Sequence, residues 1–304
     1  MMAEKIGLVT VTFNSGNVID AFIKSINSQD YPDYCLYVID NNSNDQTLKI
    51  IEEKSNSEKT IIIKNNFNNG VAGGNNQGIK KAIADGCEYI LLINNDTEFE
   101  PSLFTKLIQK SKSTGYKLIV PKMMYYDSPD TIWFGGGYFN KRMGYMNYHA
   151  GQYETDSGQY PDREITYAPT CCTLISKSVF EQVGLMDEKY FVYFDDTDFM
   201  FRVMMDGTYK MLYISDVEFY HKVGSLTKSK IGTKSKFKFG DFIIKYSTRN
   251  RVYYLKKQKS LLAFSNIIWF WLKINLKFFV SGNYDMTFKK WKLIQLSFFE
   301  GLML

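Results

Sequence analysis

Short apolar segments alternate with amphipathic ones through the first hundred residues, and this alternation most restricts the fold. Strand-sized apolar runs cover residues 6–13, 35–39, 60–63 and 89–93. Helical patterns lie between them, at residues 18–26, from about Thr47, and at residues 79–84. This order predicts a doubly wound α/β sheet with parallel strands. Right-handed crossovers then place the carboxyl ends of the strands along one edge.

Polar residues end three of these strands: Thr12–Ser15, Asp40–Asp45 and Asn94–Asp96. In open α/β sheets, ligands bind beyond the carboxyl ends of strands. A carboxylate at Asp96, flanked by amides, suits a hard divalent cation that keeps other positions for phosphate oxygens. Each polar strand end, taken alone, is equally well explained as a turn that has no role in binding or catalysis. Because three such ends converge, we predict a nucleotide-binding cleft at this edge.

A glycine-rich segment, residues 65–78, follows the third predicted strand. Its glycines do not have the GxGxxG spacing that a dinucleotide-binding fold places after its first strand. A nicotinamide-dependent dehydrogenase is therefore disfavoured. Glycine at these positions either lets the backbone approach a ligand closely or lets the following helix start tightly.

Three carboxylates, Asp195, Asp196 and Asp198, lie immediately before a helical run. A helix amino terminus stabilises each negative charge by about 0.3–1 kcal/mol, but capping needs only one acid. Neighbouring carboxylates raise one another's pKa, and a partly desolvated carboxylate can act as a general base. A lone histidine such as His221 is more often structural than a ligand. Because the only other histidine is His149, a metal site built on several histidines is excluded.

Charge divides the chain into an acidic front and a basic tail. From residue 222 to residue 304 there are 17 Lys and Arg against 3 Asp and Glu, whereas the whole chain has a net charge of +5. Its 304 residues are 45% hydrophobic, enough for one large domain or one domain with an appendage. The four cysteines form no CxxC pair, and the first apolar run is strand-sized and unlike a signal peptide. We therefore expect reduced thiols and a cytoplasmic protein.

Residues 261–280 form a long apolar run within the basic tail. Lys273 and Lys277 lie inside it, and each would cost about 2.5–3.5 kcal/mol at the centre of a bilayer. Lysines combined with Trp and Phe suit a helix that lies on an anionic membrane surface. Packing on the rest of the chain or on a second subunit of a homodimer stays open, and so does a true span. Nothing in the first 220 residues supports nucleic-acid binding, although a basic aromatic face can serve it.

Six motifs follow one another in a recognisable order. They are TVTFN (10–14), VIDNNSND (38–45), NNGVAGGNNQG (68–78), LLINNDTE (91–98), GLMDEKYFVYFDDTDFMFR (184–202) and HKVGS (221–225). In this order they resemble the family 2 glycosyltransferases, inverting enzymes with the GT-A fold. With TIWFGGG (131–137) and residues 249–251, the chain is most similar to bacterial rhamnosyltransferase-like enzymes of cell-surface polysaccharides.

The resemblance implies a division into two domains. A GT-A catalytic domain would cover residues 1–225, with a nucleotide-sugar half at about 1–100 and an acceptor half at about 101–225. Residues 226–304 would form a mainly helical, basic and aromatic-rich appendage. In the acceptor half, Gly144–Pro161 is either an acceptor-side loop or a plain surface loop.

The resemblance also implies a nucleotide site. Asp40 matches the residue that hydrogen-bonds the pyrimidine base of a UDP- or dTDP-sugar, and Thr12 and Asn14 would line the base and ribose pocket. Further nucleotide-binding residues implied by the family are Asn42, Gly74, Asn76 and Asn95.

Asp96 matches the last acid of the family's DXD motif and would coordinate Mg²⁺ or Mn²⁺. His221 would be a further ligand of the metal or the diphosphate. The chain has Asn94 where the family often has an acid or Asn, which lowers the charge of the metal site.

In the second half, Asp196 matches the family's catalytic base, and Asp195 matches its usual acidic neighbour. Asp198 and Arg202 would support them. A base that accepts the proton of the acceptor hydroxyl, together with a metal on the leaving diphosphate, gives one displacement that inverts the sugar.

The function implied is transfer of a sugar from a pyrimidine nucleotide to a growing, lipid-linked bacterial surface glycan. The favoured donor is dTDP-rhamnose, and UDP-galactose, UDP-glucose and UDP-N-acetylhexosamine are the alternatives. The expected location is the cytoplasm, at the inner face of the cell membrane. A hypothesis of another class is a non-catalytic sugar-nucleotide-binding scaffold, against which the three neighbouring carboxylates argue.

Overall fold

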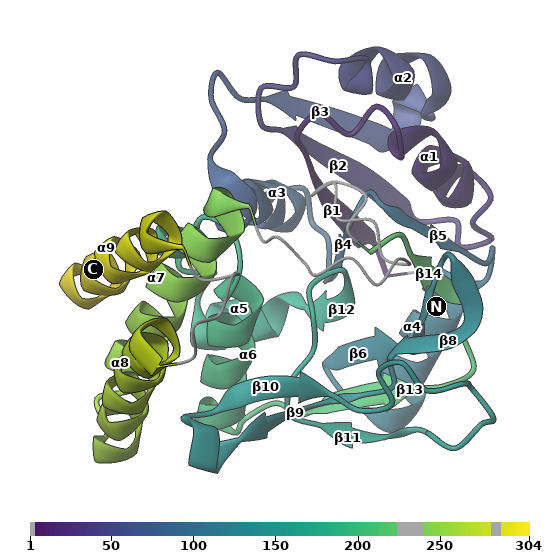
Figure 1. Cartoon of the computed structure of the whole chain (residues 1–304). Helices are drawn as coiled ribbons and strands as arrows, with labels where there is room; N and C mark the ends of the chain where they lie inside the picture. Colours follow the sequence, from purple (N-terminus) through teal and green to yellow (C-terminus); the bar gives the residue numbers. More distant parts are fainter. Residues whose placement is uncertain (1–3, 224–239, 281–286) are drawn as a thin grey trace.

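An eight-stranded mixed sheet forms the centre of the protein (Figure 1). The computed structural model describes residues 4–223, 240–280 and 287–304. From one edge of the sheet to the other, the strands are β11 (Arg163–Ile165), β13 (Met211–Ile214), β6 (Leu118–Pro121), β12 (Cys172–Ser176), β4 (Tyr89–Ile93), β1 (Ile6–Thr12), β2 (Tyr34–Asp40) and β3 (Thr60–Lys64). The parallel pairing predicted for the first hundred residues is confirmed in β4, β1, β2 and β3. Further along, β12 and β11 run antiparallel to their neighbours.

Helices cover both faces of this sheet. Those before residue 224 are α1 (Ile19–Asn27), α2 (Thr47–Lys54), α3 (Gly70–Ala84), α4 (Leu103–Thr114), α5 (Lys177–Val183) and α6 (Asp195–Asp206), with short 3₁₀ turns η1 (Ser57–Lys59), η2 (Lys141–Met143) and η3 (Glu188–Tyr190). In Figure 1, α1 and α2 lie on one side of β1–β3 and α3 lies on the other. Strands β1, β2 and β4 are buried almost throughout, as the apolar runs predicted.

The glycine-rich segment is helical from Gly70 onward, which corrects the prediction that the helix begins at Ile79. Its glycines bring α3 against β1. A Cβ added at Gly78 would lie 2.3 Å from a methyl of Val9, and one at Gly74 would lie 2.7 Å from a methyl of Val11. The glycines therefore act in helix–strand packing, which periodicity alone did not reveal.

A four-stranded sheet of β5 (Thr97–Phe99), β14 (Phe219–His221), β7 (Met123–Tyr125) and β8 (Ser128–Phe134) lies beside the large one. A hairpin of β9 (Gly137–Asn140) and β10 (Met146–His149) adjoins it. The strand-like runs that the sequence shows at residues 118–124, 164–176 and 209–220 each contain two strands, so reading each run as one strand is wrong in its extent. The chain passes from the large sheet to the small one at Lys122 and again between β13 and β14, whereas β11 and β12 both belong to the large sheet without being neighbours in it.

The basic tail is helical, as predicted, with α7 (Asp241–Lys257), α8 (Leu261–Val280) and α9 (Phe288–Met303). α7 packs against α8 and α9, and the buried Tyr254 and Phe298 belong to the same apolar cluster as Tyr190 of η3. Among the described residues, no helix combines the length and the apolarity needed to cross a membrane. All four cysteines are buried free thiols.

Candidate active site

The ends of β1 and β2 form the predicted nucleotide edge. Thr12 and Asp40 lie opposite one another in the sheet, and the Thr12 hydroxyl donates to Asp40 Oδ1 at 2.8 Å. The backbone N–H of Ser43 donates to Asp40 Oδ2 at 2.9 Å. Asp40 is therefore a buried carboxylate in a fixed orientation, and each oxygen retains a lone pair for a further donor.

Asn14 and Asn42 shape the loops beyond these two strands. Both have left-handed backbone, with φ of 52° and 65°, a conformation that asparagine adopts more readily than most residues. Asn14 Oδ1 accepts from the N–H of Asn44 at 2.9 Å, and the Asn14 N–H donates to Ser43 Oγ at 2.9 Å. The two loops are thus joined at one rim, where the side chain of Asn42 is exposed.

The other predicted nucleotide residues contact protein groups. Gly74 faces Val11. Asn95 Nδ2 donates to the carbonyl of Val11 at 2.7 Å. Asn76 Nδ2 donates to the Met186 carbonyl, at 2.9 Å, and its Oδ1 accepts from the Met186 N–H at 3.0 Å. Asn76 therefore ties α3 to the segment that leads to the carboxylates, and a ligand role for these three residues stays a prediction.

Asp96 and His221 are brought together by the pairing of β5 with β14, in which His221 lies opposite Thr97. His221 Nε2 lies 3.3 Å from Asp96 Oδ1, and both side chains are buried. Across the described part of the chain, no cluster of three or more acidic, His or Cys side chains is arranged to hold a metal. One carboxylate and one imidazole at this spacing fit as two ligands of a divalent ion whose other positions go to phosphate oxygens and water.

Asp196, the predicted base, is held by hydrogen bonds to both of its carboxylate oxygens. It is half-buried at the start of α6. The Tyr167 hydroxyl donates to Asp196 Oδ2 at 2.8 Å, and the Thr197 N–H donates to Oδ1 at 2.6 Å. Burial raises the pKa of Asp196, while these hydrogen bonds oppose the rise. Burial and the charge of Asp196 raise the pKa of the adjacent Asp195.

Aromatic and imidazole rings connect the two ends of the site. Trp133 contacts His221 with ring centroids 4.5 Å apart and contacts His149 at 4.9 Å. His149 in turn stacks on Tyr167 at 5.8 Å. Burial lowers the pKa of His149 to about 4, so its ring is neutral at physiological pH. We call these three residues, Trp133, His149 and Tyr167, the ring row.

Asp198 and Arg202 form a structural network behind Asp196. Asp198 Oδ2 accepts from Arg202 Nε at 3.0 Å, and Oδ1 accepts from the Tyr190 hydroxyl at 3.1 Å and from Lys257 Nζ at 2.7 Å. The Arg202 guanidinium also donates to the carbonyls of Val183 and Leu185 at 2.5 and 2.6 Å. The supporting role of both residues stays a prediction.

The segment just before Asp195 has unusual backbone. Phe191, Tyr193 and Phe194 have φ values of 61°, 64° and 68°, a region that bulky residues rarely adopt. Asn250 of α7, which is fully buried, donates through Nδ2 to the carbonyls of Tyr190, Val192 and Tyr193 at 2.7, 2.7 and 2.9 Å. The tail therefore holds the turn that aims the carboxylates.

Arg249 adds to this clamp from the same helix. Its guanidinium donates to the carbonyls of Lys189 and Tyr190 at 2.7 and 3.0 Å, and its Nε donates to Asn250 Oδ1 at 2.8 Å. Sequence reasoning used residues 249–251 only as a mark of similarity and missed the contacts of Arg249 and Asn250 with the segment before Asp195. It missed Tyr167 as well, because that residue lay inside an apparent strand.

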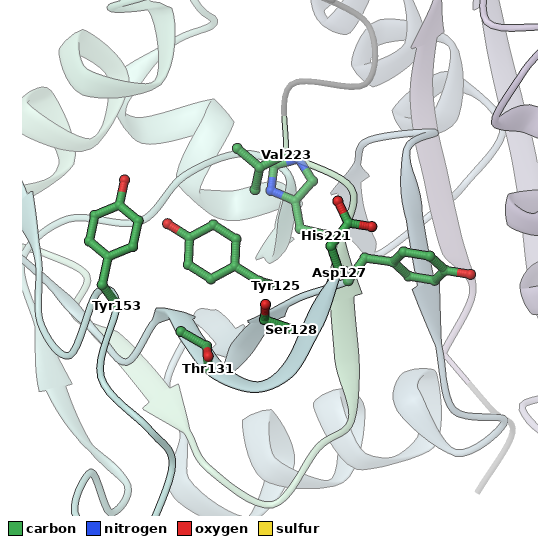
Figure 2. Close-up of a pocket in the computed structure, with 8 residues that line it drawn as sticks. Tyr125, Asp127, Ser128, Thr131, Tyr153, His221 and Val223 are labelled. Atoms are coloured by element: carbon green, nitrogen blue, oxygen red, sulfur yellow. The ribbon is translucent and has the colours of Figure 1, made fainter. Parts of the chain in front are cut away.

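A pocket of about 150 Å³ adjoins His221 (Figure 2). Its walls include Tyr125, Tyr153 and Ser128. The rings of Tyr125 and Tyr153 stack with centroids 5.5 Å apart and an interplanar angle of 17°. The predicted loop 144–161 thus contributes to a pocket, through Tyr153, as well as forming strand β10. Of the HKVGS motif, residues 224 and 225 lie outside the described residues.

The sheet order and these sites define a class of protein. A sheet whose parallel half carries polar strand ends, joined to a mixed half and followed by the adjacent carboxylates Asp195 and Asp196, is the GT-A architecture of nucleotide-sugar transferases. Residues 8–184, more than half of the chain, match the family described as Glycosyl transferase family 2. The chain belongs to that family.

Related proteins differ in how far they align. The dTDP-rhamnosyl transferase RfbF of Shigella flexneri is 26% identical over 73% of this chain and 71% of its own length. The low-salt glycan biosynthesis hexosyltransferase Agl10 of Haloferax volcanii is 25% identical over 56% of this chain. The alignment spans only 53% of Agl10, about half of that relative.

Solved structures share the fold. TarS of S. aureus, residues 1–349 in complex with UDP-GlcNAc, superimposes with a TM-score of 0.59 at 15% identity, covering 98% of this chain and 79% of that one. The mannosyltransferase PcManGT from Pyrobaculum calidifontis, in complex with GDP-Man and Mn²⁺, gives 0.56 at 11% identity, covering 99% of this chain and 87% of that one. At these identities the similarity shows the fold alone.

Proposed function

We propose that this protein is a metal-dependent, inverting glycosyltransferase that moves rhamnose from dTDP-rhamnose to a lipid-linked bacterial surface glycan. The observation that carries the proposal is a site with two chemically distinct ends, Asp96 with His221 and Asp196 with Tyr167, joined by the ring row. The end with Asp96 and His221 is suited to a site for the negatively charged diphosphate. The end with Asp196 and Tyr167 is suited to accepting a proton.

The reaction follows from this arrangement. Asp196 accepts the proton of an acceptor hydroxyl while that oxygen attacks C1 of the donor sugar. The new C1–O bond forms on the face opposite the C1–O bond to the diphosphate, which breaks as the diphosphate leaves with the electron pair. One such displacement inverts the anomeric centre. Burial and the charge of Asp196 raise the pKa of Asp195, so the negative charge of one carboxylate disfavours ionisation of the other.

Asp96 and His221 are the residues that would hold Mn²⁺ or Mg²⁺. A divalent cation there stabilises the negative charge that develops on the leaving diphosphate. Asp40 supports a pyrimidine donor, since its fixed oxygens can accept from the ring N–H of thymine or uracil. We extend this nucleotide assignment to Thr12 and Asn14 at the same rim.

The similarity to RfbF favours dTDP-rhamnose as the donor. UDP-hexoses and UDP-N-acetylhexosamines are the second candidates. They are favoured by the UDP-GlcNAc complex of TarS and by the Escherichia coli UDP-Glc:alpha-D-GlcNAc-diphosphoundecaprenol beta-1,3-glucosyltransferase WfaP, 33% identical over 31% of this chain. A pyrimidine-binding carboxylate does not separate these donors, so the sugar pocket must do so.

The outer face of α8 supports the proposal that the protein binds an anionic membrane surface on the cytoplasmic side. Besides Leu262 and Trp271, the exposed apolar side chains of α8 form a set on one face: Leu261, Phe264, Ile268, Trp269, Leu272, Leu276 and Phe279. This set lies opposite the buried Ala263, Ile267 and Ile274. Lys273 and Lys277 flank the exposed face. Such a surface suits a helix lying in a lipid interface, close to a lipid-linked acceptor.

The test is nucleotide release and sugar transfer across dTDP-rhamnose and the UDP-sugars, with Mn²⁺ and with EDTA. We expect dTDP-rhamnose to be turned over fastest and EDTA to stop turnover. Asp196→Asn should abolish transfer and leave donor binding intact. A protein that binds donors but never releases nucleotide, even in the presence of glycan lipids, would instead be the non-catalytic scaffold.

A further inference from the structure

An apolar groove of about 420 Å³ lies between α7, α8 and α9, beside the catalytic segment. Its walls include Ile244 of α7, Ile274 of α8 and Ile294 of α9, and Phe194 and Met146 complete them. Phe194 directly precedes Asp195 and Asp196 in the chain. One wall of the groove therefore belongs to the residue that leads directly into the proposed proton acceptor.

Among the described residues that line the groove, one is a cation, Arg251. Its guanidinium lies over the ring of Phe270, 4.2 Å from the centroid. Burial lowers the pKa of Arg251, and among the described residues no carboxylate pairs with it and its Nε has no hydrogen-bond partner. A desolvated charge is costly unless it is paired. The groove is therefore suited to an anion.

The ligand must satisfy both the apolar walls and the guanidinium. A nucleotide or an inorganic anion would leave the isoleucine walls in contact with water, and a neutral hydrocarbon would leave Arg251 unpaired. An amphiphilic anion satisfies both requirements. The exposed apolar face of α8 beside the groove suits delivery of such a molecule from a lipid surface.

We propose that this groove binds the lipid diphosphate of the acceptor, with prenyl units along the apolar walls and the diphosphate paired with Arg251. The assignment rests on the proposed function, in which the acceptor glycan is lipid-linked. It deepens that function, because the glycan attached to the diphosphate then extends past Phe194 toward Asp196. The relative WfaP, whose name specifies a diphosphoundecaprenol acceptor, is consistent with this class of ligand.

The experiment measures binding of farnesyl diphosphate to the full chain by calorimetry, in EDTA and without donor. We expect farnesyl diphosphate to bind about tenfold or more tightly than inorganic diphosphate or farnesol, because each of these satisfies only part of the groove. Arg251→Leu should weaken its binding by about tenfold to a hundredfold, the usual effect of losing a charge-assisted hydrogen bond. Arg142→Leu, which removes an exposed arginine, should change it less than twofold.

A second pair of variants tests the apolar walls. Ile294→Trp places a larger side chain in the groove and should weaken farnesyl diphosphate binding, whereas Leu296→Trp on the exposed face of α9 should not. Thermal unfolding of each variant verifies that it is folded. Saturating UDP or dTDP should leave the binding unchanged, because the nucleotide edge is built from other strands.

Several results would overturn the proposal. They are equal binding to Arg251→Leu and wild type, equal binding of inorganic diphosphate and farnesyl diphosphate, and displacement of farnesyl diphosphate by UDP. Equal binding of a short-chain phosphatidylglycerol would make the groove a general lipid site and refute the acceptor assignment. The binding measurements contain no sugar donor. Their outcome therefore does not depend on the donor-turnover test of the proposed function.

Discussion

Replacing Tyr167 with Phe should shift the acidic limb of the pH–rate profile to higher pH. Tyr167 donates to Asp196 Oδ2 at 2.8 Å, and this bond favours the ionised carboxylate. Burial and the charge of Asp196 raise the pKa of Tyr167, so the hydroxyl remains a donor throughout the useful pH range. The Phe variant keeps the buried ring and removes only this donor.

The magnitude follows from the bond. A hydrogen bond to a charged group contributes about 1.5–3 kcal/mol, and one pKa unit corresponds to about 1.4 kcal/mol. Losing the bond should therefore raise the pKa of Asp196 by about one to two units. Because the base must be ionised to accept a proton, activity is lost as pH falls through this pKa. In the variant that loss begins at a pH about one to two units higher.

The assay is kcat/KM for sugar transfer measured across pH in the wild type, Tyr167→Phe and a control. Tyr148→Phe is the control, because Tyr148 is half exposed and its ring makes a tilted contact with Tyr138 in the same hairpin. Asp195 and Asp198 also face this region, so the limb reports the coupled acids and not Asp196 alone. An acidic limb at the same pH in Tyr167→Phe and the wild type would refute the reasoning.

Four further outcomes are expected. Asn250→Ala removes the donor to three carbonyls; it should lower kcat more than tenfold while donor affinity stays within about threefold, and should reduce unfolding free energy by about 1–3 kcal/mol. A normal kcat would show that the turn does not need the clamp. Asp96→Ala should abolish the Mn²⁺-dependent increase in melting temperature with UDP or dTDP; an unchanged increase would contradict the metal assignment. Lys273→Glu with Lys277→Glu should reduce sedimentation with anionic vesicles, most clearly at low salt; undiminished sedimentation would contradict the lipid-facing orientation of α8. Gly78→Val places side-chain atoms against Val9 and should lower the unfolding free energy by about 1–3 kcal/mol, measured by urea denaturation; full stability would show that α3 can move away.

The first hundred residues were predictable because their elements depend on local pattern. Runs such as Tyr89–Ile93 are buried on both faces of a parallel sheet, and their apolar character is continuous in the sequence. The polar residues that end them reach the expected edge because right-handed crossovers leave few topologies. The helix beginning at Gly70 was missed because glycine has a low helix propensity, and packing against β1 overrides it.

In the candidate site, the sequence drew attention only to residues whose type and local pattern already suggest chemistry. Asp196 stands out in a run of acids, whereas Tyr167 is one tyrosine among 22 in the chain. Its significance depends on a contact with Asp196 across the fold. Asn250 was hidden for the same reason, since an asparagine within a helix acquires a function only when carbonyls of another segment converge on it.

The clamp by Asn250 has a consequence for synthesis. The residues that match the family end at residue 184, the acids follow at 195–198, and the helix that fixes their turn begins only at Asp241. A chain that stops before Asp241 would still contain the sheet and the nucleotide edge. The turn that precedes its acids would lack the hydrogen bonds from Asn250. Under the proposed function, a chain without α7 keeps its donor-binding edge, whereas sugar transfer requires α7 to have folded against the turn.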